Sequence, residues 1–211
     1  LVVDVKGIYS IEKFLVARRL MYWQVYLHKT SVAAEKMLVD ILKRAKELAA
    51  AGHDLFGSPA LRFFLYNTFD RGSFRQSDKA LEMFALLDDS DLVCAIKVWG
   101  SHNDLVLSTL CRDFTNRRLF KVEINAEVLT GEKQNEYLQQ YMQHFGVSKK
   151  EAQYFLGDEA VSTDTYSPED ENINILMKDG TVMDVTDASD MLNISVLTKR
   201  VEKHFFCYYK V

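Results

Sequence analysis

"IEKFLVARRLMYWQVYLHKTSVAAEKMLVDILKRAKELAA", residues 11–50, contains neither glycine nor proline. Its apolar residues recur at intervals of three and four, which is the spacing of one face of an α-helix. They are Leu15, Leu20, Met37, Leu38, Ile41, Leu42, Ala45 and Leu48. The charged residues opposite them are Lys36, Asp40, Lys43 and Arg44. The pattern predicts long helices with a buried apolar stripe and a solvated charged face.

Capping residues indicate where these helices begin, bend and end. Ser10 is a candidate N-cap, and the polar run 28–31 favours a bend between two helices. Gly52 stands where a helix C-cap is expected, before a loop at 57–59. Further helices are predicted near 59–67, 77–87, 89–99 and from Ser101 or Asn103 to about 115.

The pattern changes after about residue 116. Residues 119–124 and 203–211 are strand-like, and residues 132–145 have a helical pattern. Ser148 and Glu151 have the spacing of a capping box. Asp179-Gly180, between two β-rich runs, predicts a hairpin. We therefore expect an α+β protein, with a mainly helical domain over 1–116 and an α+β domain with a small antiparallel sheet over 117–211.

Composition limits the classes of function. A chain of 211 residues, 48% hydrophobic, can bury a substantial core. Its net charge of −4 gives no broad attraction to nucleic acid or to anionic lipid. No apolar run reaches the roughly 18 residues of a membrane span, and no signal peptide is visible. The three cysteines, Cys94, Cys111 and Cys207, have no CxxC spacing and are expected to be packing thiols of a reducing, cytoplasmic compartment.

The adjacent pair His53-Asp54 has the residue types of a metal-activated hydrolytic site. Such a site needs further histidine and carboxylate ligands that converge on the ion. Here the pair follows a C-cap glycine and precedes Gly57-Ser58-Pro59, so its backbone is expected to be an exposed connection. We interpret the pair as a polar turn and expect this chain to bind no metal.

Arg18, Tyr22 and Tyr26 form a stronger candidate site because they are spaced i, i+4 and i+8 on one predicted helix face. An arginine fork beside aromatic rings suits a phosphate with a sugar or base. The alternative is a helix whose tyrosine and tryptophan side chains pack in the core and whose arginine is solvated. A second basic group, Arg112, Arg117, Arg118 and Lys121, could bind an anion or could be the solvated end of a helix, where cations are favoured.

Three stretches resemble the HD-superfamily phosphohydrolases, and among them the bacterial subgroup related to dGTP and dNTP triphosphohydrolases. They are "KGIYSIEKFLVARRLMYWQVYLHKTSVAAEKML" (6–38), "SDLVCAIKVW…VLSTLCRDFTNRRLFKVEI" (90–124) and "NINILMKDGTVMDVTDASDMLNISVLTK" (172–199). Tyr26-x-His28-Lys29 before a long helix is the most specific part. In that family the metal ligands precede the segment with which this chain opens. The resemblance, together with a first residue that is not methionine, implies a C-terminal portion that lacks the metal-binding core.

The resemblance also implies roles for particular residues. Arg18 matches an arginine that contacts substrate phosphate in the mammalian HD-domain dNTPase, and Tyr26 matches a tyrosine beside the substrate sugar. Tyr22 falls where that relative has a histidine of the catalytic pocket. Lys6, Arg117 and Lys121 match basic residues that bind activating nucleotides between subunits. Asp4 stands where the relative has a further nucleotide-binding arginine, which departs from its regulatory site.

We therefore expect the C-terminal part of a metal-dependent phosphohydrolase that acts on nucleoside triphosphates as a homo-oligomer. This part would supply pocket wall and assembly surface, with no catalytic or metal-binding residue, while the intact protein would hold a divalent metal. The alternative is a non-catalytic regulatory or oligomerisation module that binds a nucleotide. Metal ligands encoded upstream of this chain would distinguish the two. A nucleic-acid-binding function is disfavoured by the net charge.

Overall fold

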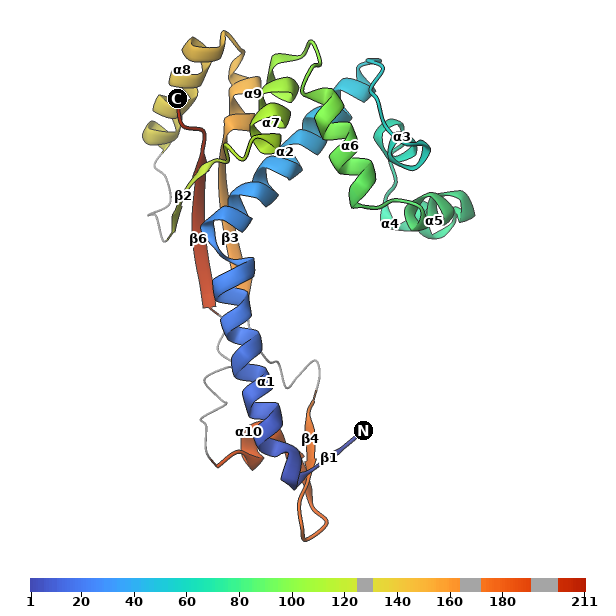
Figure 1. Cartoon of the computed structure of the whole chain (residues 1–211), viewed down its shortest axis with the longest axis vertical. Helices are drawn as coiled ribbons and strands as arrows, with labels where there is room; N and C mark the ends of the chain where they lie inside the picture. Colours follow the sequence, from blue (N-terminus) through green and yellow to red (C-terminus); the bar gives the residue numbers. More distant parts are fainter. Residues whose placement is uncertain (125–130, 164–171, 191–200) are drawn as a thin grey trace. The chain divides into compact units, whose positions relative to one another are not determined.

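The protein is described by a computed structural model over residues 1–124, 131–163, 172–190 and 201–211 (Figure 1). Helices account for 61% of it and the sheets are small, which confirms the predicted α+β class. No helix in these ranges is both long enough and apolar enough to cross a bilayer. The polar, acidic composition of residues 162–172 predicts a loop, and this segment lies largely outside the described residues.

The chain forms two compact units, and each is assembled from separated stretches of sequence. Unit 1 comprises Leu1–Val32, Glu123–Val128 and Asp158–Phe206. Unit 2 comprises Ala33–Val122, Leu129–Gly157 and Cys207–Val211. The division of the sequence into domains 1–116 and 117–211 stays a prediction.

Unit 1 contains a three-stranded sheet of order β1-β4-β5. Strand β1 (Val3–Asp4) pairs in parallel with β4 (Asn174–Leu176), and β4 pairs antiparallel with β5 (Val182–Asp184). The turn between β4 and β5 contains Gly180 at φ 86°, a left-handed conformation that glycine adopts without strain. The hairpin predicted at Asp179-Gly180 is therefore confirmed.

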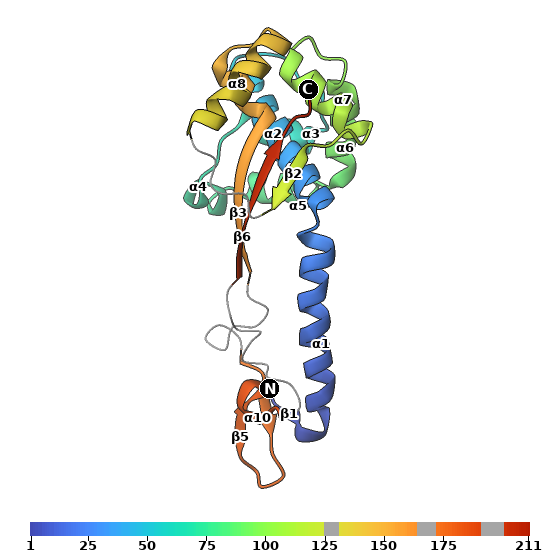
Figure 2. The same ribbon diagram turned by 90° about the vertical axis from the view of Figure 1, so that its left-hand side faces the viewer.

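Helix α1 (Ile8–Met21) packs against this hairpin and against α10 (Val185–Ala188), as Figures 1 and 2 show for its N-terminal part. The buried cluster between them contains Ile8, Leu15, Ile175 and Val185. The prediction of Ser10 as the N-cap of this helix was wrong. The helix begins at Ile8, after a 3-10 turn at Val5–Gly7, and its N-cap is Gly7.

A π-helical segment, Tyr22–Tyr26, follows α1, and α2 (Lys29–Ala50) begins three residues later. The break predicted near residues 28–31 is confirmed, but the π-helix before it was not predicted. The Leu27 N–H donates to the Tyr22 carbonyl at 2.8 Å, and the Ser31 hydroxyl donates to the Val25 carbonyl at 2.8 Å. These bonds satisfy carbonyls that regular α-helical pairing would leave without a donor at a helix end.

Unit 2 is built around α2, whose apolar stripe Met37, Ile41 and Ala45 is fully buried. Helices α3 (Pro59–Tyr66), α5 (Asp78–Ala85), α6 (Asp89–Trp99), α7 (Leu105–Thr115) and α8 (Gly131–Phe145) confirm the predicted helices. Two short helices, α4 (Arg71–Arg75) and the 3-10 helix Gln153–Phe155, were not predicted. The capping box of α9 (Lys149–Ala152) was predicted from Ser148 and Glu151.

The expectation that the charged face of α2 is solvated was wrong in part. Lys36 and Asp40 were expected on a solvated face, but they are only 8% and 3% exposed. The helix is covered on this side as well, because Tyr154 and Gly157, which follow α9, lie against it. A second correction concerns α7, whose N-cap is Asp104 rather than Ser101 or Asn103. Its carboxylate accepts the Leu107 N–H at 2.8 Å.

The second sheet has the order β2-β6-β3, and all three strands have residues in both units. Strands β2 (Lys121–Ile124) and β6 (Val201–Tyr208) were predicted, whereas β3 (Leu156–Thr163) was not. Its sequence mixes glycine, acidic and small residues, which are poor strand formers. Among the cysteines, Cys111 and Cys207 are buried as expected of packing residues, and Cys94 is exposed.

Candidate functional site

The predicted group Arg18, Tyr22 and Tyr26 lies at the junction of α1 and the π-helix, within unit 1. The Arg18 guanidinium carbon lies 5.9 Å from the centre of the Tyr22 ring. The rings of Tyr22 and Tyr26 follow at 5.3 Å between centres, tilted by 49°. The structure thus brings the three side chains into one column of a cation and two aromatic rings, each within contact range of the next.

The column is open to solvent rather than buried in the core. Arg18 is exposed, Tyr22 is partly exposed, and Tyr26 is 53% exposed. Of the alternative, the tyrosines packed in the core are not found in this chain, whereas the solvated arginine is. Exposed aromatic faces beside a guanidinium can stack with a base or sugar and attract a phosphate.

The π-helix sets the direction of these side chains. A π-turn adds one residue to the helical repeat, so side chains after it are rotated relative to an unbroken α-helix. Trp23, on the same segment, contacts the Lys203 ammonium at 3.8 Å from its ring centre. Trp23 is thereby engaged within unit 1, while Tyr22 and Tyr26 remain accessible.

The second predicted group does not form a single cluster within either unit. Lys6 is exposed in the 3-10 turn Val5–Gly7 of unit 1, and its backbone N–H donates to the Asp4 carboxylate at 2.9 Å. Arg117 and Lys121 are exposed residues of unit 2. Arg117 adopts φ 58° just after α7, the left-handed position at which helices commonly end.

The neighbouring Arg118 is occupied by a structural contact. Its guanidinium forms an ion pair with Asp113 at 2.7 Å, and Asp113 also accepts the Tyr209 hydroxyl at 2.7 Å. Burial, followed by this hydrogen bond, raises the pKa of Tyr209 to about 12. Arg118 is thus paired with the end of α7, although its side chain is 67% exposed, and Arg112, Arg117 and Lys121 are exposed cations of the same segment.

The His53-Asp54 pair lies in the connection after α2, as predicted. Both residues are exposed; Asp54 accepts from Arg62 at 2.9 Å, and the His53 ring lies edge-on to His102 at 6.2 Å. Across the ranges that the structure describes, no three His, Cys, Asp or Glu side chains are grouped as metal ligands would be. The expectation that the pair is a polar turn is confirmed, and the absence of metal binding stays a prediction.

The sequence did not predict a cluster of charged residues around Arg44. Arg44 contacts Asp104 at 2.6 Å, Glu151 at 2.9 Å and Glu47 at 3.3 Å. Asp104 and Glu151 lie 60 and 107 residues from Arg44 along the chain, and only Glu47 is close in sequence. The only local signal was the i, i+3 pair of Arg44 with Glu47, so spacing could not reveal the rest.

Comparison with known proteins gives matches to a family model, to a curated protein and to solved structures. Residues 1–55 match the family model described as the HD associated region. The chain is 29% identical over 221 residues to the uncharacterized protein YwfO of Bacillus subtilis, with all of this chain and 47% of that protein covered. A phosphohydrolase of Bacteroides thetaiotaomicron, solved by crystallography, is 51% identical with a TM-score of 0.89, covering 99% of this chain and 52% of that one.

A hypothetical protein from Aquifex aeolicus shares the fold, with a TM-score of 0.56 at 18% identity over 99% of this chain and 44% of that one. The chain thus spans about half the length of these relatives. The family-model match and the Bacteroides structure together support an HD-type phosphohydrolase family. Arg18, Tyr22, Tyr26 and Lys6 lie inside the matched residues 1–55, whereas Arg117 and Lys121 lie outside them.

Proposed function

We propose that this chain is the C-terminal part of an HD-type phosphohydrolase that acts on nucleoside triphosphates, and that it forms one wall of the substrate pocket. The observation that carries the proposal is the exposed column of Arg18, Tyr22 and Tyr26. Its position within the HD associated region and the likeness to a solved phosphohydrolase support it.

In this proposal the three side chains bind and orient the nucleotide. The Arg18 guanidinium donates to phosphate oxygens and neutralises part of their charge. Tyr26 packs against the sugar, and Tyr22, which stacks between the two, holds the guanidinium in place by its ring face. Binding and orientation bring the phosphate into a reactive position and so contribute to catalysis without a proton transfer.

A divalent metal is expected in the intact protein, where it would activate water for attack on phosphorus. The described part of this chain gathers no set of three metal-ligating side chains, so these residues do not fit such an ion. We therefore assign to this chain only the contacts with the nucleotide. The metal ligands are proposed to come from the portion of the intact protein that this chain does not include.

The test is nucleotide turnover by the intact protein. Removing the charge-assisted contact of Arg18 by Arg18→Ala costs about 1.5–3 kcal/mol. That corresponds to a loss of roughly 10- to 150-fold in kcat/KM for a deoxynucleoside triphosphate. Tyr26→Phe should retain more activity than Tyr26→Ala, because the ring rather than the hydroxyl makes the contact.

Lys13→Ala is the matched control, because Lys13 is an exposed cation on the same helix α1. It removes one positive charge and should leave kcat/KM within about twofold of wild type. The proposal would be contradicted if the Arg18→Ala and Lys13→Ala proteins were equally active and had unchanged helical content by circular dichroism. Arg18 would then be a solvated helix residue with no role in nucleotide binding.

A further inference from the structure

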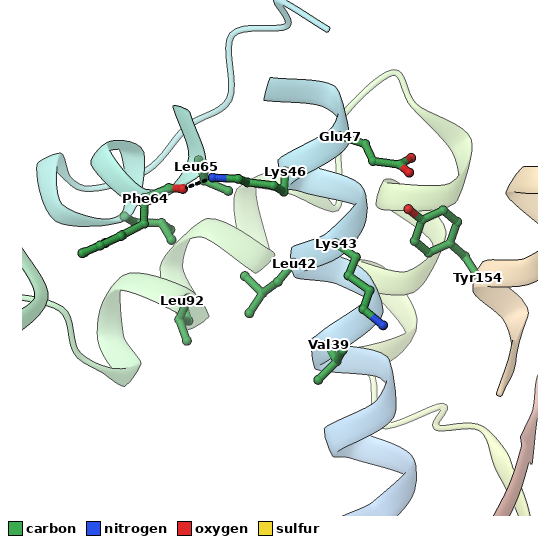
Figure 3. A pocket seen from close by; sticks show the side chains of 10 residues that line it. Val39, Leu42, Lys43, Lys46, Glu47, Phe64, Leu65, Leu92 and Tyr154 are labelled. Atoms are coloured by element: carbon green, nitrogen blue, oxygen red, sulfur yellow. Dashed lines mark hydrogen bonds between the residues drawn. The ribbon is translucent and has the colours of Figure 1, made fainter. Parts of the chain in front are cut away.

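Unit 2 contains an apolar cavity of about 580 Å³ beside α2 (Figure 3). Its apolar wall comes from α2, α3 and α6 and consists of Val39, Leu42, Leu61, Phe64, Leu65 and Leu92. Lys46 lines it too, but its ammonium is held by the carbonyls of Phe64 and Asn67, each at 2.5 Å. The volume lies within the roughly 300–1,000 Å³ of pockets that bind small organic ligands.

A smaller polar cavity of about 230 Å³ adjoins it. The two share Lys43, Glu47 and Tyr154 in their walls, and Figure 3 shows Lys43 and Glu47 pointing from α2 toward Tyr154. The polar cavity is completed by Lys36, Asp40, Lys150 and Gln153. One continuous face of α2 therefore has an apolar part and a charged part.

The charges of the polar part do not balance. Lys36 is paired with Asp40 at 2.6 Å, and Lys150 is paired with Glu47 at 3.0 Å. Among the described residues, Lys43 has no ion-pair partner and its side chain is exposed. The wall of the polar cavity thus contains three cations and two anions. Lys46 adds a fourth cation, on the apolar cavity, where two carbonyls hold its ammonium, so the cation available to a ligand is Lys43, where the two cavities meet.

We propose that the two cavities form one binding site for a fatty-acid carboxylate, with its hydrocarbon chain in the apolar cavity and its head group on Lys43. A hydrocarbon chain needs no hydrogen bonds and gains from contact with the leucines and Phe64. A single negative charge matches the ammonium of Lys43, since the ammonium of Lys46 is already held by two carbonyls. A nucleoside triphosphate fits less well, because its several charges would meet one available ammonium and its base would lose hydrogen bonds in the apolar wall.

The site is distinct from the proposed nucleotide site. Arg18, Tyr22 and Tyr26 belong to unit 1, and none of them lines either cavity. Failure of one proposal therefore leaves the other standing. Arg18→Ala should weaken nucleotide binding without changing the affinity for a fatty acid.

The experiment is calorimetric titration of the chain with octanoate, decanoate and dodecanoate below their micelle concentrations. Each added methylene should tighten binding about three- to fourfold, as expected for burial of a methylene group, with saturation at one molecule per chain. Decyltrimethylammonium, which has a chain of the length of decanoate but the opposite head-group charge, should bind more weakly than decanoate.

Two variants and one control locate the ligand. Lys43→Gln should weaken the binding of dodecanoate by about two- to fivefold, the range of an exposed ion pair. The same variant should bind decanoate no more tightly than decyltrimethylammonium. Leu92→Gln, inside the apolar wall, should flatten the dependence on chain length. Lys97→Gln removes the same charge from α6 at an exposed residue outside both cavities and should bind as wild type.

Several results would overturn the proposal. They are binding of many molecules per chain, equal affinity for the two head groups, and the same affinity for Lys43→Gln and Lys97→Gln. Displacement of dodecanoate by dGTP, itself weakened by Lys43→Gln, would assign the site to a nucleotide instead. Circular dichroism of each variant, compared with wild type, checks that any loss of affinity is not caused by unfolding.

Discussion

Lys36 and Asp40 form an ion pair of 2.6 Å in unit 2, and both side chains are almost fully buried. Gly157 makes this arrangement possible, because a Cβ at that residue would overlap the Lys36 Cε atom. A buried ion pair is favourable only when its geometry is good, since both ions have lost their hydration. The absent side chain at Gly157 is therefore part of the packing around Lys36.

We predict that Gly157→Ala lowers the free energy of unfolding by about 1–3 kcal/mol, the usual cost of forcing extra volume into a packed interior. Urea titration followed by circular dichroism measures it. Gly131→Ala is the control, because a Cβ at Gly131 would meet no atom within 4 Å. Equal unfolding midpoints for the two variants would show that Lys36 moves aside without cost.

The start of α7 carries a charged cap that is also part of an ion pair. Asp104 caps the helix and forms an ion pair with Arg44 at 2.6 Å. Burial alone would raise its pKa, but hydrogen bonds from Arg44 and from the Leu107 N–H, together with the Arg44 charge, outweigh burial and lower the pKa. A carboxylate whose pKa is lower in the folded than in the unfolded state stabilises the fold above its unfolded pKa, near 3.9 for aspartate.

We predict that Asp104→Asn lowers stability at pH 7 and flattens the loss of stability as the pH falls below about 4. Asparagine is a good N-cap, so the change removes the charge and retains the cap. Urea midpoints between pH 7 and pH 2.5 measure the slope. Asp89→Asn, at an exposed residue in the first turn of α6, serves as control. Parallel pH profiles for wild type and Asp104→Asn would contradict the assigned role.

Local patterns predicted most elements, but not those defined by distant contacts. Caps and apolar spacing located α3, α6 and α9, because these signals involve residues within one or two turns. The π-helix Tyr22–Tyr26 has no such signal, and α2 appeared to have a solvated face because Lys36 and Asp40 are charged. Strand β3 is formed through its pairing in the β2-β6-β3 sheet rather than through its own composition.

For the whole molecule, we predict that the intact protein is a homo-oligomer whose assembly responds to a nucleoside triphosphate. Lys6, Arg117 and Lys121 are exposed cations drawn from both units of this chain. If a polyanion gathers such cations at a subunit contact, its binding favours the assembled form by mass action. Sedimentation of the intact protein with and without nucleotide should show a larger mass with it, and Lys6→Ala and Arg117→Ala should reduce that shift.

Arg75→Ala is the control, because Arg75 is an exposed cation on α4 outside the predicted group. It should leave the nucleotide-dependent mass unchanged. Identical mass distributions with and without nucleotide, for wild type and all variants, would remove the regulatory role of these residues. The fold and the Arg18 column would be unaffected by that result.

The sequence by itself determined the α+β class, most helix ends and the Asp179-Gly180 hairpin, because helical spacing, capping and turn signals are local. Helical spacing also singled out Arg18, Tyr22 and Tyr26 as candidates. Only the tertiary structure decided that these three side chains are exposed in one column and that Lys36 is buried. It also decided that Arg44 contacts Glu47 of α2, Glu151 of α9 and Asp104, the N-cap of α7. Burial and ion pairing depend on which segments pack together, and contacts 60 to 107 residues apart leave no periodic trace in the sequence.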